Sequence, residues 1–208
     1  MLQITTDPIG KGKERVCFVH PDDPQKAIKI SIGSISVQSR REIKFYQKLK
    51  QRDDAHDPHI PRFYGLCETS LGQGIVVDLI RDQQGEISRP LNWYLAEGYP
   101  IEDFEPYLDE LKNSFLQNLI IFNHDMTIGN LLFQKVSATS ARLVAIDGLG
   151  DVVAVDWLDV FPPLLRRKIL RRWSRFIDRV YRTSEVRLQR EALARDPQLV
   201  TKSLKPDY

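Results

Sequence analysis

The sequence predicts an α+β fold with two lobes, a strand-rich N-terminal part followed by a mostly helical C-terminal part. Short strand-like segments separated by turn residues fill most of residues 2–80, with one helical segment among them. Apolar residues then recur at helical spacing from about residue 107. With 208 residues, 42% of them hydrophobic, the chain can bury a sizeable core. We place the N-lobe at about 1–82, the C-lobe at about 83–190 and a frayed tail at 191–208.

The N-terminal elements follow from alternation and turn residues. A turn with Gly10 and Gly12 separates the first two strands. In the third strand, Lys29 alternates with Ile28 and Ile30, as in a half-buried strand. We expect a five-stranded antiparallel meander, with one helix inserted after its third strand. The expected strands are 2–7, 15–19, 26–32, 62–69 and 74–80, and the helix is 36–49.

The C-terminal elements are mainly helices. After a polar loop and a short helix, a longer helix is predicted because its apolar residues keep one face. Two short strands follow, and Pro162 and Pro163 then begin a long basic helix. The expected bounds are 81–90 for the loop, 91–95 and 107–122 for the helices, and 131–133 and 142–146 for the strands.

Composition and charge exclude several classes of protein. The net charge of +2 does not demand nucleic acid or an anionic membrane as a partner. Cys17 and Cys67 both lie in apolar, strand-like runs, which argues against a disulfide framework and for a reducing cytoplasm. The start of the chain lacks the pattern of a signal peptide, and the most apolar window, 143–161, contains four aspartates. We therefore expect a cytoplasmic protein without a membrane span.

A glycine-rich turn, a lysine and a glutamate form the first candidate site. Gly10 and Gly12 lack a Cβ, so backbone N–H groups there could approach phosphate oxygens closely. A lysine on the third strand can contact nucleotide phosphates when a glutamate of the next helix holds its ammonium, and Lys29 and Glu42 have these positions. Alternatively, the turn is a plain hairpin, Lys29 is an edge lysine and Glu42 is a solvated residue paired with neighbouring basic side chains.

Two aspartates and an asparagine form the second candidate site. Asp125 and Asn130 are five residues apart on a loop between a helix and a strand, and Asp147 ends the next strand. Phosphoryl transfer needs a carboxylate that orients the attacking hydroxyl and hard oxygen ligands for Mg²⁺. Because both aspartates have apolar neighbours, we expect them in a semi-buried cleft where a divalent cation compensates their charge. The alternative is that they belong to ordinary capped turns.

Together these motifs resemble those of the protein-kinase-like fold, and the whole chain resembles the YrbL family of small kinase-like bacterial proteins in the PhoP regulatory network. The resemblance implies that Asp125 is the catalytic base and that Asn130 and Asp147 bind Mg²⁺. It implies that the other site residues bind ATP: Gly10 and Gly12 in the nucleotide loop, Lys29 on the phosphates, Glu42 as its anchor, and the backbone of Asp78, Leu79 and Ile80 on adenine.

The function implied by the resemblance is transfer of the γ-phosphate of MgATP, bound between the lobes, to a hydroxyl of an unknown protein or small-molecule acceptor. Some residues depart from the kinase pattern. Arg15 stands near the place of a third glycine, Asn123 replaces a histidine and Thr127 replaces a lysine. The C-lobe is also short. The alternative is therefore a catalytically weak or inactive pseudokinase that acts as a regulatory binding protein.

The predicted basic helix is the third candidate site. Ten basic and two acidic residues between 166 and 190 give it a charge of 10 − 2 = +8, while 97–110 is rich in acidic residues. The simple interpretation is that the helix is solvated or packs beside this acidic stretch, since Trp173, Phe176, Val180 and Tyr181 form an apolar stripe. The functional one is an anionic partner, such as RNA, a phospholipid head group or a phosphorylated substrate.

Overall fold

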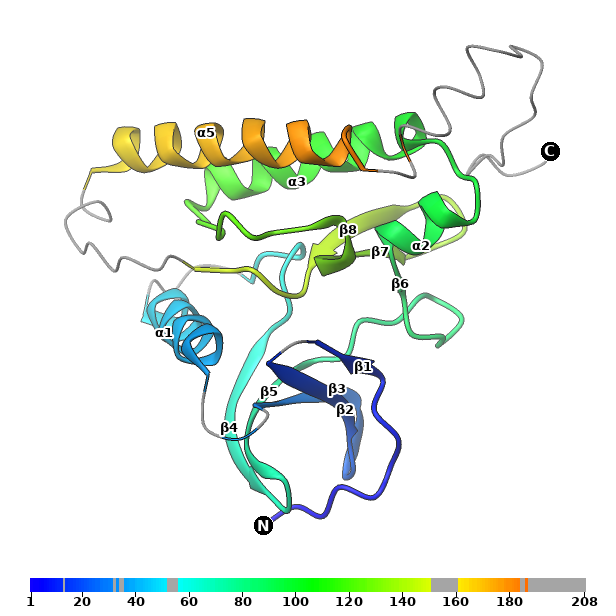
Figure 1. Ribbon diagram of the computed structural model, residues 1–208, viewed down its shortest axis with the longest axis vertical. Coiled ribbons are helices and arrows are strands. Elements are labelled where there is room, and N and C mark those ends of the chain that lie inside the picture. The colour runs from blue at the N-terminus through cyan, green and yellow to red at the C-terminus, as the bar shows by residue number, and fades with distance from the viewer. Residues whose placement is uncertain are drawn as a thin grey trace.

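Two parts of the protein are stacked end to end in the computed structural model, which describes residues 1–12, 14–31, 33, 36–51, 56–150, 161–183 and 186. In Figure 1, a five-stranded sheet and α1 lie at one end, and α3 and α5 lie side by side at the other. A small three-stranded sheet lies between them. The predicted α+β architecture, with an antiparallel N-terminal sheet, one helix and a mostly helical second part, is confirmed.

The five-stranded sheet has the order β1-β2-β3-β5-β4, so the predicted meander is wrong. After α1 the chain crosses to the far edge, and β4 returns through a tight turn to β5, which pairs with β3. Residues 2–7 form no strand; Leu2 makes one bridge to Thr69, and the first strand lies at the glycine-rich turn instead. The strands are β1 (Gly10–Lys11), β2 (Arg15–His20), β3 (Asp23–Ser31), β4 (Phe63–Thr69) and β5 (Gly72–Asp78).

The second half of β3, residues 27–31, is buried on both faces, not on one as predicted. Ile28 and Ile30 pack with Phe18 under Leu2 and Ile4 of the N-terminal segment. Alternation then directs Lys29 to the opposite face, where it is also buried. A buried lysine needs a charged partner, and the adjacent helix supplies one.

Helix α1 (Val37–Gln51) turns a partly polar face toward the sheet. Ser39, Glu42 and Tyr46 are its buried residues, at the i, i+3, i+7 spacing of one helical face. Val37, at the start of the helix, is exposed. The inner face of α1 therefore presents a carboxylate to β3.

Within the described residues, the C-terminal part packs three α-helices around the small sheet β6-β7-β8. Helix α3 ends at Gln117, five residues before the predicted end, and Leu119 has a φ of 51° where the chain turns away. The sheet consists of β6 (Arg89–Pro90), β7 (Leu131–Lys135) and β8 (Ala141–Ala145). The helices are α2 (Leu91–Ala96), α3 (Glu105–Gln117), α5 (Pro162–Val180) and the short η1 (Ile101–Phe104) and η2 (Ile128–Asn130).

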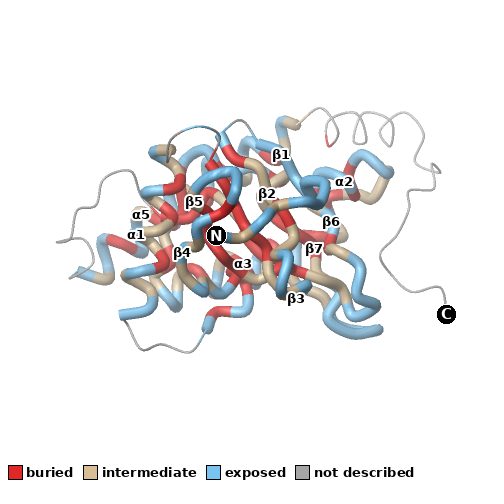
Figure 2. The backbone as a smooth tube through the Cα atoms, turned by 90° about the horizontal axis from the view of Figure 1, so that it is seen from below, coloured by how far each residue is buried: buried red, intermediate tan, exposed pale blue. Residues whose placement is uncertain are grey.

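The main core lies where these elements meet, and Figure 2 shows buried residues gathered in the interior. Leu165, Ile169, Trp173, Phe176 and Val180 of α5 face this core, which confirms the apolar stripe of the basic helix. The frayed tail and the last residues of the predicted basic helix lie outside the described residues. None of the described helices is long and apolar enough to cross a membrane.

Candidate functional site

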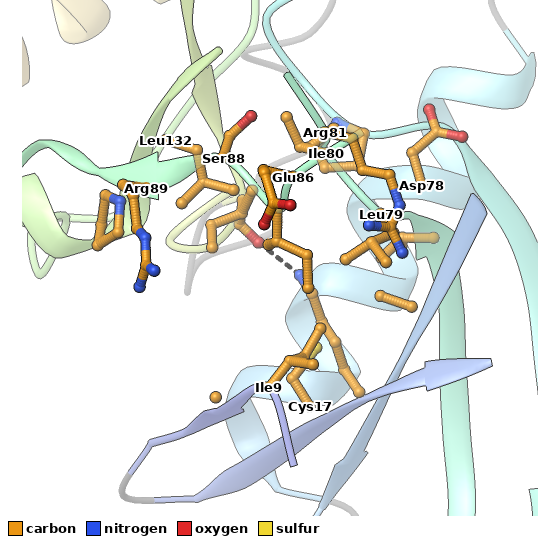
Figure 3. A pocket seen from close by; sticks show the side chains of 18 of the residues that line it. Ile9, Cys17, Asp78, Leu79, Ile80, Arg81, Glu86, Ser88, Arg89 and Leu132 are labelled. Atoms are coloured by element: carbon orange, nitrogen blue, oxygen red, sulfur yellow. Dashed lines mark hydrogen bonds between the residues drawn. The ribbon is translucent and has the colours of Figure 1, made fainter. Parts of the chain in front are cut away.

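A cavity of about 590 Å³ lies between the five-stranded sheet and the C-terminal part, a size typical of small-molecule sites. Figure 3 shows Ile9 and Cys17 on one wall and Leu132 on the facing wall. The connection between the two parts, including Leu79 and Ile80, closes one side. Of the predicted ATP-binding residues, Gly10, Lys29, Asp78, Leu79 and Ile80 line the cavity.

Lys29 joins this cavity to a cluster of charges. Its Nζ lies 2.6 Å from Glu42 Oε1 and also donates a hydrogen bond to the carbonyl oxygen of Ile146. The structure thus brings the lysine of β3 and the glutamate of α1 together, and neither is an edge or solvated residue. Glu42 itself does not line the cavity.

Arg15 is the site residue that the sequence reasoning missed. We noted it only as a departure from a third glycine, yet its side chain is only 7% exposed and contacts both carboxylates of the cluster. Nη1 donates a hydrogen bond to Glu42 Oε2, and Nη2 forms an ion pair with Asp147 Oδ1 at 2.5 Å. No local pattern reveals these contacts, because Glu42 and Asp147 lie far along the chain.

Asp147 is held in place from several sides. Its Oδ1 also accepts hydrogen bonds from Gln38 Nε2 at 3.1 Å and from the Gly148 N–H at 2.6 Å. Burial raises the pKa of this carboxyl, but the positive charges of Lys29 and Arg15 outweigh burial and hold its pKa below the usual range. Asp147 is therefore an ionised, semi-buried carboxylate, with 27% of its side chain exposed.

The loop with Asp125 lies beside the segment with Asp147. The Asn123 N–H donates to the Gly148 carbonyl oxygen at 2.6 Å, and Phe122 pairs with Leu149. Asp125 itself is 70% exposed, 3.0 Å from His124 Nε2, so its predicted semi-buried position is wrong. Its apolar neighbour Met126 is buried instead, because the chain turns at this point.

The predicted Mg²⁺ does not fit the site in this arrangement. Asp147 Oδ1 already accepts two hydrogen bonds and forms an ion pair with Arg15. Asn130 lies near Asp147, because its Nδ2 would be 3.6 Å from a Cβ atom added at the next residue, Gly148. No group of three or more His, Cys, Asp or Glu side chains in the described part of the chain could hold a metal ion. Arg15 and Lys29 already neutralise Glu42 and Asp147, so the charge argument for a divalent cation does not hold.

The backbone groups expected to contact adenine are partly occupied. The Asp78 N–H donates to the Arg62 carbonyl oxygen at 3.1 Å, and the Leu79 N–H donates to the backbone carbonyl oxygen of Gln25 at 2.8 Å. The Ile80 carbonyl oxygen accepts from the Ser88 N–H at 3.0 Å. Within the described residues, this leaves the Ile80 N–H without a protein acceptor.

The glycine-rich turn forms the β1–β2 hairpin. The Gly12 N–H donates to the carbonyl oxygen of Arg15 at 2.8 Å, which closes the turn. Gly10 lines the cavity and Gly12 does not. The hairpin interpretation is therefore correct for the backbone, and the predicted contact with phosphate stays a prediction.

The basic helix α5 has an inner and an outer set of arginines. On the inner side, Arg172 donates to the Phe122 carbonyl oxygen and Arg179 donates to that of Met126 at 3.1 Å. These two bonds hold both ends of the loop that carries Asp125. On the outer side lie the exposed arginines 167, 171 and 175, and the described residues provide no ion pair or hydrogen bond for their side chains.

A polar segment between the two parts was also missed. Asp57 accepts hydrogen bonds from the His59 N–H at 2.8 Å, from Asn118 Nδ2 at 2.7 Å and from the Ser114 hydroxyl. His59 Nδ1 lies 2.8 Å from the Leu143 carbonyl oxygen. This segment attaches the chain entering β4 to α3 and β8, but its local sequence has only the residue types of a polar loop.

The sequence matches known proteins over most of its length. A family profile described as PhoP regulatory network protein YrbL matches residues 3–181. The YrbL proteins of Escherichia coli strain K12 and Shigella flexneri are each 31% identical over 175 residues, which is 82% of this chain and 83% of each relative. A double mutant of the Mycobacterium tuberculosis PknI kinase domain has a TM-score of 0.48 at 14% identity, and the match covers 68% of this chain and 58% of that one.

Proposed function

The chain belongs to the YrbL family of PhoP regulatory network proteins, and from this premise we propose that it binds ATP and transfers the γ-phosphate to a hydroxyl group. The acceptor is an unknown protein or small molecule. We place this activity in the cytoplasm, within a PhoP-type regulatory network.

The observation that carries the proposal is the buried Lys29–Glu42 ion pair beside the cavity. A lysine held by a carboxylate keeps its ammonium in one position, ready to contact phosphate oxygens. Ala27, Val77 and Leu132 give the cavity apolar walls that suit the faces of a purine ring. The Ile80 N–H can donate to a ring nitrogen.

In the proposed reaction, the acceptor oxygen forms a bond to the γ-phosphorus while the bond between this phosphorus and the bridging oxygen of ADP breaks. Asp125 takes the proton of the hydroxyl. Its exposed carboxylate suits this role, because an acceptor can reach it from solvent. The hydrogen bonds from Arg172 and Arg179 attach this loop to α5, and the bond from the Asn123 N–H to Gly148 keeps it beside the segment of Asp147. Because the arrangement around Asp147 does not fit the Mg²⁺ predicted at Asn130 and Asp147, no step of the reaction involves the metal.

ATP turnover by the Asp125→Asn variant tests the catalytic part of the proposal. Removing the base should lower turnover by about 10²–10⁴-fold, whereas ATP binding should persist. Asp22→Asn, at an exposed turn residue, is the matched control and should react like the parent protein. Equal turnover in the parent protein and Asp125→Asn would remove Asp125 from the mechanism.

A nucleotide-binding regulatory protein without catalysis is the second candidate. The contact of Arg15 with Asp147 favours it, because the carboxylate expected to bind the metal is occupied. The two candidates differ in one measurement. Both bind ATP, but in the second ADP release stays at background in the parent protein and in Asp125→Asn.

For the anionic partner expected at 166–190, the outer arginines of α5 are the proposed contact. Arg167, Arg171 and Arg175 are four residues apart, so they form one stripe on the helix. Binding to a polyanion such as heparin should weaken with salt and disappear in the triple Glu variant of these residues. A triple variant that still binds heparin would exclude the stripe.

A further inference from the structure

We infer that the Arg15 guanidinium takes the place of a divalent cation at Asp147, so that Arg15 and a metal ion are alternative partners of this carboxylate. The inference deepens the proposed function, because it concerns the same phosphate-proximal end of the site. It assigns a role to a residue of β2 that neither faces solvent nor fills the apolar core.

The position of Arg15 is fixed by its surroundings. Its backbone pairs with Ser31 of β3, and its carbonyl oxygen accepts the hydrogen bond that closes the hairpin turn. Glu42 binds one end of the guanidinium and Asp147 lies 2.5 Å from the other. The arginine thus spans from α1 to the segment after β8 and presents a cation to the only carboxylate of that segment within the described residues.

The charges of the cluster leave no place for a further cation. Arg15 and Lys29 contribute two positive charges, and Glu42 and Asp147 contribute two negative ones, so the four groups sum to zero. A divalent ion beside Asp147 would add two positive charges a few ångströms from Arg15, in a site that is mostly shielded from water. The two hydrogen bonds and the ion pair at Asp147 Oδ1 also leave only the second oxygen for a metal.

Removing the guanidinium reverses this balance. In Arg15→Gln, Lys29 still pairs with Glu42, while Asp147 loses its strongest partner and the cluster carries one negative charge. Asp147 and the nearby Asn130 then offer hard oxygen ligands of the kind that Mg²⁺ and Mn²⁺ prefer. Arg15→Lys retains the positive charge and should keep metal away.

Mn²⁺ titration without nucleotide, followed by the electron paramagnetic resonance signal of the free ion, tests the inference. Arg15→Gln should bind Mn²⁺ at least about tenfold more tightly than the parent protein, and Arg15→Gln/Asp147→Asn should lose the gain. Arg15→Lys and the exposed charge control Arg62→Gln should bind Mn²⁺ like the parent protein. Equal Mn²⁺ affinity of Arg15→Gln and the parent protein would overturn the inference, as would a gain that survives Asp147→Asn.

A second measurement needs no Arg15 variant and decides the matter if Arg15→Gln does not fold. Calorimetric titration of the parent protein with ATP should give dissociation constants within about threefold in excess EDTA and in excess Mg²⁺. Binding that is tenfold or more tighter with Mg²⁺ contradicts the inference. If ATP binds in neither buffer, the proposed function fails, and the Mn²⁺ comparison, including Arg15→Lys, still decides the role of Arg15.

Discussion

Lys29 Nζ lies 2.6 Å from Glu42 Oε1, and this ion pair joins the central strand of the N-terminal sheet to α1. Both side chains are almost completely buried, with 10% and 2% exposed. Glu42 also accepts a hydrogen bond from Arg15, so this one carboxylate contacts two buried cations. The arrangement of the proposed nucleotide site and the stability of the N-terminal part therefore depend on the same residue.

Glu42→Gln should lower the free energy of unfolding by about 3–5 kcal/mol, because it leaves two buried cations with one carboxylate between them. Urea unfolding measures this loss. The matched control is Glu68→Gln, which changes an exposed glutamate of β4 and should cost less than about 0.5 kcal/mol. Equal stability of the two variants would show that the ion pair does not contribute.

The stabilising contribution of Asp147 should be lost in acid. The charges of Lys29 and Arg15 hold its pKa below the usual range, even though burial raises it. Its contribution to the free energy of unfolding is therefore complete above the ordinary aspartate pKa of about 3.9, and it is lost as the pH falls through the lower, folded-state pKa. Urea unfolding in EDTA should show Asp147→Asn less stable at pH 7, with a difference that shrinks in acid. A constant difference across pH contradicts this.

Asp57→Ala should destabilise the protein by about 1–3 kcal/mol, because the buried His59 N–H and two partly buried donors lose their acceptor. Thermal or urea unfolding measures the change. Asp22→Ala, in an exposed turn, serves as control. If Asp57→Ala unfolds like the parent protein, its hydrogen bonds do not hold the two parts together.

Arg179→Gln should loosen the loop of Asp125 without unfolding the protein. The Met126 carbonyl oxygen loses a donor on α5, so hydrogen exchange over residues 122–126 should accelerate. The exposed Arg175→Gln on the same helix is the matched control and should leave this exchange unchanged. If hydrogen exchange over residues 122–126 is unchanged in Arg179→Gln, the hydrogen bond from α5 does not position the loop.

Local pattern predicted most of the elements. The pairing of Lys29 with Glu42 was expected from the kinase-like combination of a strand lysine and a helix glutamate, with a solvated Glu42 as the alternative. Local pattern did not predict the order of β4 and β5, which depends on pairing between distant strands. Local pattern also did not predict that Asp125 is exposed, because apolar neighbours do not determine the direction of a side chain in a turn. The role of Arg15 was missed because both of its partners come from other elements, far along the chain.

ATP binding to the parent protein and to Lys29→Met, measured by thermal unfolding, tests the central claim most directly. ATP at about 100 times its dissociation constant should raise the melting temperature of the parent protein by about 5–10 °C. Lys44→Met, on the exposed side of α1, should show the same rise. The account predicts that Lys29→Met folds but shows little or no rise. No rise in the parent protein, or an equal rise in Lys29→Met, would contradict a nucleotide site at Lys29.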